Sequence, residues 1–299
     1  MRSTQLESLR RSNVVSASSL SELSRALRSG FETHTGALLC LDFDGTLAPI
    51  ADDPSEPTIT PANERAIRYL SLHPRATVAI ISGRALSDVR ARVGVPNVVY
   101  AGNHGLELYD GNRVSTHPDA LRSLPAMQRA CELLRWQLAP ISGVRIENKR
   151  LSLTVHYRQA PRAVVPVIET AVRRLMETPE PTTRAPFRLV SGKQSFELRP
   201  AVDWDKGDAV TQLEHGVPDG WTTIYIGDDT TDEDAFRALD AHDFDVFVGP
   251  AETTARYRIP EQSAVHTVLE WIVRLVDATD SVDTAPHRPL TPRSGDTRR

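Results

Sequence analysis

The stretch ALLCLDFDGT, residues 37–46, places two aspartates, Asp42 and Asp44, at the end of a continuous apolar run. Aspartate is a poor strand former, and an ionised carboxylate is costly to bury. A continuous apolar run is typical of a parallel strand that is covered on both faces. Ligands bind beyond the carboxyl ends of such strands, so the two aspartates indicate a functional loop.

Strand and helix signals alternate outward from this stretch. Helical patterns separate five apolar strand signals, at 36–43, 76–83, 97–103, 222–229 and 244–249. Thr60 and Pro61 are typical of the start of the first of these helices. The alternation predicts an α/β fold, with a doubly wound parallel sheet as a Rossmann-like core.

A different pattern interrupts the middle of the chain. Residues 117–199 read as a helix and two strands, repeated once, which is typical of a small antiparallel sheet carrying two helices. We interpret this segment as an α+β (αββαββ) cap domain, inserted into a catalytic core of residues 35–116 and 200–279. Residues 1–34 are expected to form an N-terminal extension with one helix. Residues 280–299 lack periodicity and contain several prolines, so we expect a disordered tail.

The composition argues against several classes of protein. The 299 residues carry a formal net charge of −4, which indicates no basic surface for nucleic acid. No apolar run approaches the roughly 20 residues of a membrane span, and the first residues do not resemble a signal peptide. The two cysteines, Cys40 and Cys131, match no disulfide framework or metal spacing. We therefore expect a cytoplasmic protein without nucleic-acid or membrane partners. A monomer is a separate expectation that these observations do not decide.

Polar clusters follow the predicted core strands. They are DFDGT (42–46), SGR (82–84), GNHG (102–105) and GDDTTDED (227–234), and Lys206 opens the helix before the last of these strands. The loops at the carboxyl ends of parallel strands are expected to converge. Clustered carboxylates indicate Mg²⁺, while a lysine and glycine-rich turns indicate an anionic substrate, most simply a phosphate.

In this order, DFDGT, SGR, Lys206 and GDDTTDED resemble the four motifs of the haloacid dehalogenase superfamily of phosphatases. The resemblance covers about residues 37–277. It implies that Asp42 attacks phosphorus and forms an aspartyl-phosphate, and that Asp44 acts as general acid and then base. It also implies that Ser82 donates a hydrogen bond to a phosphoryl oxygen.

The same resemblance implies a magnesium site. Asp42, Asp228 and the backbone carbonyl of Asp44 would hold the ion, and Lys206 would neutralise the phosphate. Three nearby residues are expected to orient these groups or the phosphate: Thr46, Asp229 and Asp232. Asp232 could instead be a first-turn helix charge, and Ser82 could be a simple helix cap.

Motifs in the cap and in the GNHG loop narrow the resemblance. GNHG with Glu107, ExK at 147–149 with Ser152, HYR at 156–158, and GK followed by ELRP resemble the trehalose-6-phosphate phosphatase family. This implies a phosphoric monoester hydrolase that converts trehalose 6-phosphate to trehalose and phosphate in trehalose biosynthesis. The residues implied in substrate binding are Arg84, Asn103, His104, Glu107, Lys149, Arg150, His156, Arg158, Lys193 and Glu197.

The residues alone leave alternatives open. Arg150 and Arg158 could be solvated strand charges, and His156 could be a half-buried strand residue. Lys193 and Glu197, four apart on one predicted strand, could form a plain salt bridge. The alternative functions are a phosphatase for sucrose phosphate or a hexose phosphate, a phosphomutase, and an inactive sugar-phosphate sensor. There is no room for a synthase-like domain, so we expect a stand-alone phosphatase.

Overall fold

The computed structural model describes residues 20–51, 57–177, 187–192 and 194–279. Lys193, the predicted tail and most of the predicted N-terminal extension lie outside these ranges. The chain forms two compact units, the first made of residues 1–81, 92–99 and 206–299 and the second of residues 82–91 and 100–205. The predicted core (35–116 and 200–279) and cap (117–199) were delimited by the order of strands and helices along the chain. Their boundaries differ from those of the two units and stay a prediction.

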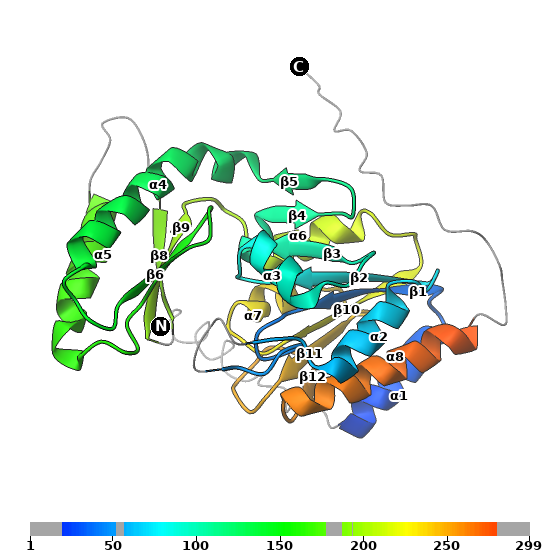
Figure 1. Cartoon of the computed structure of the whole chain (residues 1–299). Coiled ribbons are helices and arrows are strands. Elements are labelled where there is room, and N and C mark those ends of the chain that lie inside the picture. The colour runs from blue at the N-terminus through cyan, green and yellow to red at the C-terminus, as the bar shows by residue number, and fades with distance from the viewer. Residues whose placement is uncertain (1–19, 52–56, 178–186, 193, 280–299) are drawn as a thin grey trace, which may run out of the picture. The chain divides into compact units, whose positions relative to one another are not determined.

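The first unit contains five parallel strands in the order β12-β11-β10-β1-β2 (Figure 1). They are β1 (Gly36–Leu41), β2 (Ala76–Ile81), β10 (Trp221–Gly227), β11 (Phe244–Val248) and β12 (Tyr257–Ile259). Strand β1 pairs with β10 on one side and β2 on the other, and all of its residues are buried. Burial on both faces explains its continuous apolar sequence.

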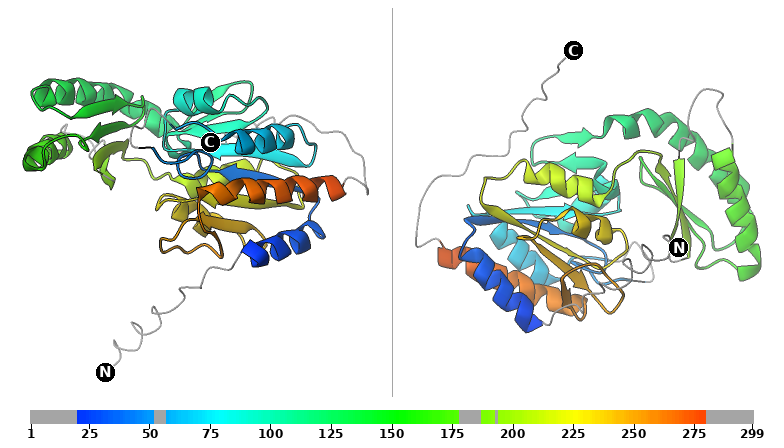
Figure 2. Two further views of the ribbon diagram at one scale, coloured as in Figure 1. Left: turned by 60° about the horizontal axis from the view of Figure 1, so that its bottom comes forward. Right: turned by 180° about the vertical axis from the view of Figure 1, so that it is seen from behind.

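Helices cover both faces of this sheet. They are α1 (Leu20–Phe31), α2 (Pro61–Leu70), α6 (Lys206–Glu214), α7 (Asp232–Ala238) and α8 (Val265–Thr279). Helices α2 and α8 lie side by side, with α1 against α8, and α6 and α7 pack together on the face seen in the right panel of Figure 2. The predicted start of α2 is confirmed, since the hydroxyl of Thr60 accepts a hydrogen bond from the N–H of Asn63.

The second unit begins with a short antiparallel ladder. Helix α3 (Leu86–Val93) and strand β3 (Val99–Gly102) each cross the division between the units. Strand β3 pairs with β4 (Glu107–Tyr109), and β4 pairs with β5 (Val114–Thr116). The tight turn between β3 and β4 carries the GNHG sequence.

A four-stranded antiparallel sheet forms the rest of the second unit, in the order β6-β7-β9-β8. Its elements are α4 (Pro118–Leu138), β6 (Arg145–Asn148), β7 (Leu153–His156), α5 (Val165–Glu177), β8 (Phe187–Gly192) and β9 (Ser195–Pro200). Helices α4 and α5 cover one face (Figure 1), where Val155 and Phe196 belong to the apolar core. Because side chains alternate along a strand, Thr154 and Glu197 lie on the opposite, polar face.

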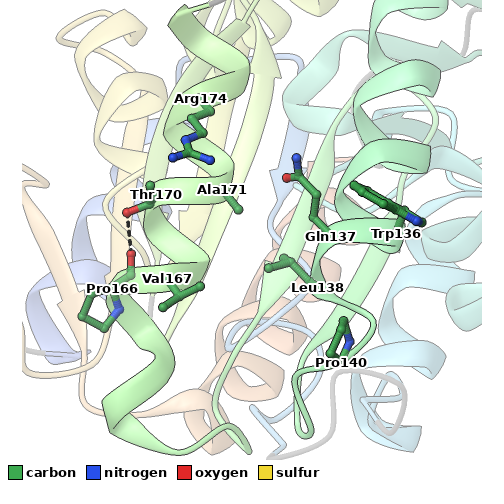
Figure 3. Close-up of a pocket in the computed structure, with 9 residues that line it drawn as sticks. All are labelled: Trp136, Gln137, Leu138, Pro140, Pro166, Val167, Thr170, Ala171 and Arg174. Carbon is green, nitrogen blue, oxygen red and sulfur yellow. Dashed lines mark hydrogen bonds between the residues drawn. The ribbon is translucent and has the colours of Figure 1, made fainter.

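A groove of about 680 Å³ lies between the end of α4 and the beginning of α5 (Figure 3). Its lining is mostly apolar and includes Trp136, Leu138, Pro140, Pro166, Val167 and Ala171. The hydroxyl of Thr170 is satisfied by the carbonyl of Pro166 at 2.7 Å. None of the expected site residues that the structure describes lines this groove.

The described elements agree with the predicted fold class. A parallel sheet is flanked by helices, and the αββαββ elements of the predicted cap fold as a separate antiparallel sheet. The strands β4, β5 and β12 are not predicted, because three residues are too few for a period-two pattern. No helix among the described residues combines the length and apolarity needed to cross a membrane.

Candidate active site

The first aspartate of the DFDGT loop directly follows β1. Asp42 is 5% exposed, and its N–H donates to the carbonyl of Ile226 at 2.9 Å, which fixes the strand end against β10. The chain then turns at Gly45, whose φ of 82° lies in the region that favours glycine. A Cβ atom at Gly45 would lie 2.1 Å from Oδ2 of Asp228, so this glycine allows the two acidic loops to approach.

Lys206, the first residue of α6, is buried beside these loops. Its Nζ donates to Oδ1 of Asp42 and to Oδ1 of Asp232, each at 2.7 Å. Burial alone would lower the pKa of Lys206, but Asp232 and Asp42 raise it above its ordinary value. Burial raises the pKa of Asp42 well above its ordinary value; Lys206 opposes this rise, and the carboxylates of Asp232 and Asp228 add to it.

Asp232 is fully buried at the start of α7 and accepts hydrogen bonds on both carboxylate oxygens. Oδ1 accepts from Lys206 and from the hydroxyl of Tyr225, both at 2.7 Å. Oδ2 accepts from the backbone N–H groups of Asp228 at 3.0 Å and Asp229 at 2.9 Å. Asp232 therefore contacts both Lys206 and the backbone of the acidic loop, and its expected part in orienting the site stays a prediction.

A divalent cation fits this cluster. Oxygens of Asp42, Asp228 and Asp232 all lie within 4.8 Å of one another. Three carboxylates face one lysine, so the ionised cluster carries a negative excess that a dication would balance. Carboxylate oxygens are ligands that Mg²⁺ prefers. Because both oxygens of Asp232 already accept hydrogen bonds, Asp42 and Asp228 are the better candidates to hold the ion directly.

The other predicted site residues of the first unit, Asp44, Thr46 and Asp229, lie in the same two loops and differ in solvent exposure. Asp44 is half-buried in the loop after β1, where it forms a backbone bridge with Ala48. Thr46 is fully buried, and its carbonyl accepts from Nε2 of Gln262 at 3.0 Å. The side chain of Asp229 is exposed, so the described contact of Asp229 with the cluster is made by its backbone.

In the second unit, the SGR and GNHG loops contact each other. The carbonyl of Ser82 accepts from the N–H of His104 at 2.9 Å, and Gly83 leaves room for the His104 ring. The hydroxyl of Ser82 accepts from the N–H of Arg84 at 3.2 Å, so it caps the local turn. Arg84 donates to Asp88 at 2.9 Å. The two loops converge as expected, while the parts of Ser82 and Arg84 in phosphate or substrate binding stay predictions.

The GNHG turn has an unusual backbone. Asn103 and His104 have φ values of 51° and 59°, in the left-handed region that few residues other than glycine adopt. Nδ2 of Asn103 donates to Glu107 at 2.8 Å, and Oδ1 of Asn103 accepts from Ser152 at 2.8 Å. Glu107 also pairs with Arg150. Strained backbone held by a polar network is common at functional sites.

Glu197 is the centre of a second charged cluster. This carboxylate is 8% exposed and pairs with Nζ of Lys149 at 2.9 Å and with the guanidinium of Arg199 at 2.6 Å. Nε2 of His104 lies 3.7 Å from Oε2 of Glu197. Burial raises the pKa of the Glu197 carboxyl, but Lys149, His104 and Arg199 together lower it well below its ordinary value. Glu197 is thus ionised across the neutral pH range.

Other cap residues have separate surroundings. His156 pairs with Glu147 at 2.8 Å on the polar face, and Arg158 is exposed. Burial raises the pKa of Glu147, but the hydrogen bond from His156 and the charge of Lys149 lower it below its ordinary value. Lys193 lies outside the described residues, so its pairing with Glu197 stays a prediction. Arg199 was not expected, although period-two alternation along β9 places it on the same face as Glu197.

Two sets of candidate residues therefore result. One set in the first unit combines a buried lysine with a carboxylate cluster that fits a hard dication. The other set, in the second unit, surrounds Glu197 and Glu107 with mixed donors and acceptors. The first set can bind and transfer a phosphoryl group, and the second can recognise a polyhydroxylated ligand. The meeting of the two sets at one substrate stays a prediction.

Comparison with known proteins identifies relatives. A protein of Mycobacterium tuberculosis (strain ATCC 25618 / H37Rv), named trehalose-phosphate phosphatase, is 36% identical over 243 residues, covering 78% of this chain and 60% of that protein. The chain thus spans less than two thirds of the length of this curated relative.

Solved structures share the fold. The crystal structure of a trehalose-6-phosphate phosphatase related protein aligns with a TM-score of 0.71 and 24% identity, covering 81% of this chain and 99% of that one. A haloacid dehalogenase-like hydrolase from Bacteroides thetaiotaomicron aligns with a TM-score of 0.54 and 15% identity, covering 80% and 99%. These likenesses confirm the predicted haloacid dehalogenase-like fold.

The family itself follows from a sequence model rather than from the fold. The family model described as trehalose-phosphatase matches residues 40–263, which is more than half of the chain. The matched range runs from the end of β1 to just before α8 and includes both clusters described above. The chain therefore belongs to the trehalose-phosphatase family.

Proposed function

We propose that this protein is a Mg²⁺-dependent phosphatase that hydrolyses trehalose 6-phosphate to trehalose and phosphate through an aspartyl-phosphate. The observation that carries the proposal is the buried bridge of Lys206 between Asp42 and Asp232, beside Asp228, in a member of the trehalose-phosphatase family. A cytoplasmic location and a monomeric state remain predictions.

The first step forms a bond between Asp42 and phosphorus. Because Lys206 holds Oδ1 of Asp42, we assign the attack to Oδ2. The bond from phosphorus to the sugar oxygen breaks as Asp44 protonates that oxygen, and the free sugar leaves. Lys206 neutralises charge on the transferring group. A Mg²⁺ ion held by Asp42, Asp228 and the Asp44 carbonyl would stabilise the phosphoryl oxygens electrostatically.

The second step returns the enzyme to its starting state. Asp44, now ionised, takes a proton from water, and the resulting nucleophile attacks the phosphorus of the aspartyl-phosphate. The phosphorus bond to Asp42 breaks and inorganic phosphate is released. The ammonium group of Lys206 on Asp42 favours the ionised form that attack requires, whereas half-buried Asp44 can exchange a proton with water.

The test is phosphate release from a panel of sugar phosphates with Mg²⁺. We expect kcat/KM for trehalose 6-phosphate to exceed that for sucrose 6-phosphate and glucose 6-phosphate by at least about tenfold, since one well-placed hydroxyl contact contributes roughly that much. Preference for another sugar phosphate would favour a different phosphatase of this class. A mutase would isomerise a sugar phosphate without releasing phosphate, and a sensor would bind without turnover.

A change at Glu197 tests sugar recognition by the second unit. If Glu197 and its cations bind sugar hydroxyls, Glu197→Gln should lower kcat/KM for trehalose 6-phosphate by about tenfold to a hundredfold, because hydrogen bonds to charged groups contribute roughly 1.5–3 kcal/mol. An aryl phosphate has no sugar hydroxyls and should lose little. The measurement is the ratio of the two kcat/KM values in wild type and variant.

Glu169→Gln is the matched control for this change. Glu169 pairs with Arg173 on the exposed surface of α5. Glu169→Gln should therefore leave kcat/KM unchanged for both substrates. If Glu197→Gln lowers kcat/KM equally for trehalose 6-phosphate and the aryl phosphate, Glu197 supports the folded structure rather than sugar binding. No loss for either would make its ion pairs structural and leave sugar recognition to other residues.

A further inference from the structure

A buried tyrosine hydroxyl contacts the candidate active site from within the sheet. Tyr225 lies on β10, is fully buried, and donates from its hydroxyl to Oδ1 of Asp232 at 2.7 Å. Its ring packs edge-on against Phe236, with centroids 5.6 Å apart. A buried phenol hydroxyl is costly unless it is hydrogen-bonded, and a ring alone would fill the same space. The hydroxyl therefore needs an explanation beyond packing.

The acceptor of this hydrogen bond is the residue that orders the cluster. Oδ1 of Asp232 is shared between Tyr225 and Lys206, while Oδ2 holds the backbone of the acidic loop. The carboxylate is planar, so fixing one oxygen from the sheet side fixes the direction in which the other faces. The hydroxyl and the ammonium group approach the same oxygen, and the hydroxyl thereby restricts where Nζ of Lys206 can lie.

Lys206 has two acceptors, and their balance matters for the reaction. Its distances to Asp42 and Asp232 are equal at 2.7 Å. Without the hydroxyl, Asp232 would carry more uncompensated charge and would draw Lys206 away from Asp42. Burial and the neighbouring carboxylates of Asp232 and Asp42 raise the pKa of Tyr225 well above its ordinary value, so it remains a donor at every working pH.

We propose that Tyr225 is a positioning residue for phosphoryl transfer, whose hydroxyl holds Asp232 so that Lys206 stays on the nucleophile Asp42. The inference rests on the proposed phosphatase function, and it concerns phosphoryl transfer rather than recognition of the sugar. It assigns to the middle of β10 a part in catalysis that the motif GDDTTDED alone does not contain.

The test is Tyr225→Phe, which keeps the ring and removes one oxygen. We expect kcat to fall about tenfold, the size of effect that follows from loss of one hydrogen bond to a charged group. KM should stay within about twofold, because the variant retains the substrate-binding groups. The dissociation constant of Mg²⁺ for the substrate-free protein should also stay within about threefold, because the bonds of Oδ2 to the acidic loop remain.

Tyr69→Phe is the matched control. The hydroxyl of Tyr69 donates to Asp277 at 2.7 Å on the surface of the same unit. Tyr69→Phe therefore removes a hydrogen bond from tyrosine to aspartate outside the candidate active site. Its kcat should equal that of wild type. Equal kcat values for Tyr225→Phe and wild type would overturn the proposal, as would a loss that Tyr69→Phe shares.

A double-mutant cycle with Asp232→Asn distinguishes positioning from general destabilisation. It compares the losses in kcat of the two single variants with that of the double variant, so it remains informative even if Tyr225→Phe is less stable than wild type. If the hydroxyl acts through the Asp232 carboxylate, the two losses in kcat should not multiply. Multiplicative losses would overturn the proposal. All variants are also assayed with an aryl phosphate. If wild type hydrolyses the aryl phosphate but not trehalose 6-phosphate, the proposed sugar substrate is wrong. The effect of Tyr225→Phe can still be measured with the aryl phosphate.

Discussion

Asp42→Asn should reduce phosphate release from trehalose 6-phosphate to the background rate. An amide oxygen cannot form the phosphoenzyme, and removal of a covalent nucleophile can cost on the order of 10⁶-fold in kcat. The residue is buried, follows the central strand β1 and is held by Lys206, so no neighbouring carboxylate takes the same place without rearrangement. Steady-state release of phosphate measures the loss, and mass spectrometry excludes reversion of Asn to Asp.

The same change should not unfold the protein. The pKa of Asp42 is raised in the folded state, so at neutral pH its ionised form is disfavoured there relative to the unfolded chain. Asparagine cannot ionise. The unfolding midpoint of the metal-free variant at pH 7 should therefore equal or exceed that of wild type. The difference should shrink as the pH falls through the raised pKa of Asp42 and should be lost below the ordinary aspartate pKa.

Asp277→Asn is the control for Asp42→Asn. Asp277 is a half-exposed aspartate of α8 that accepts a hydrogen bond from Tyr69, and its replacement should leave turnover unchanged. Turnover near the wild-type rate in unreverted Asp42→Asn protein would disprove the covalent mechanism. A large drop in the unfolding midpoint would instead assign the lost activity to misfolding.

Removal of divalent metal should have the second largest effect. The cluster of Asp42, Asp228 and Asp232 contains three carboxylates and one lysine, and a phosphate monoester adds further negative charge. Without a dication, the substrate would be repelled from the nucleophile at short range and in a buried site. We expect excess chelator to abolish phosphate release and added Mg²⁺ to restore it.

The metal prediction has further readouts. Ca²⁺ should restore much less activity, because it favours longer bonds and more ligands than Mg²⁺. Mg²⁺ should raise the unfolding midpoint of wild type, since an ion that binds only the folded state stabilises it, and should raise that of Asp228→Asn less. Full activity in excess chelator would refute the assignment of a metal ion to this cluster.

Local patterns in the sequence predicted the α/β class and selected the loops that hold the candidate residues. Continuous apolar runs followed by polar turns predict buried parallel strands, and such strands place their carboxyl ends at one edge. Asp42, Asp228 and Lys206 could be selected in this way, because each stands at a strand end or helix start. The αββαββ order of the cap also follows from local periodicity.

The partners of the charged side chains were decided only by the tertiary structure. The sequence suggests Lys193 as a neighbour of Glu197, whereas the described partners of Glu197 include Lys149 from another strand end and Arg199. In the same way, Tyr225 looks like an ordinary residue of a buried strand until its hydroxyl is seen on Asp232. Periodicity reports which face a side chain takes, but the partner it meets there depends on how distant segments pack.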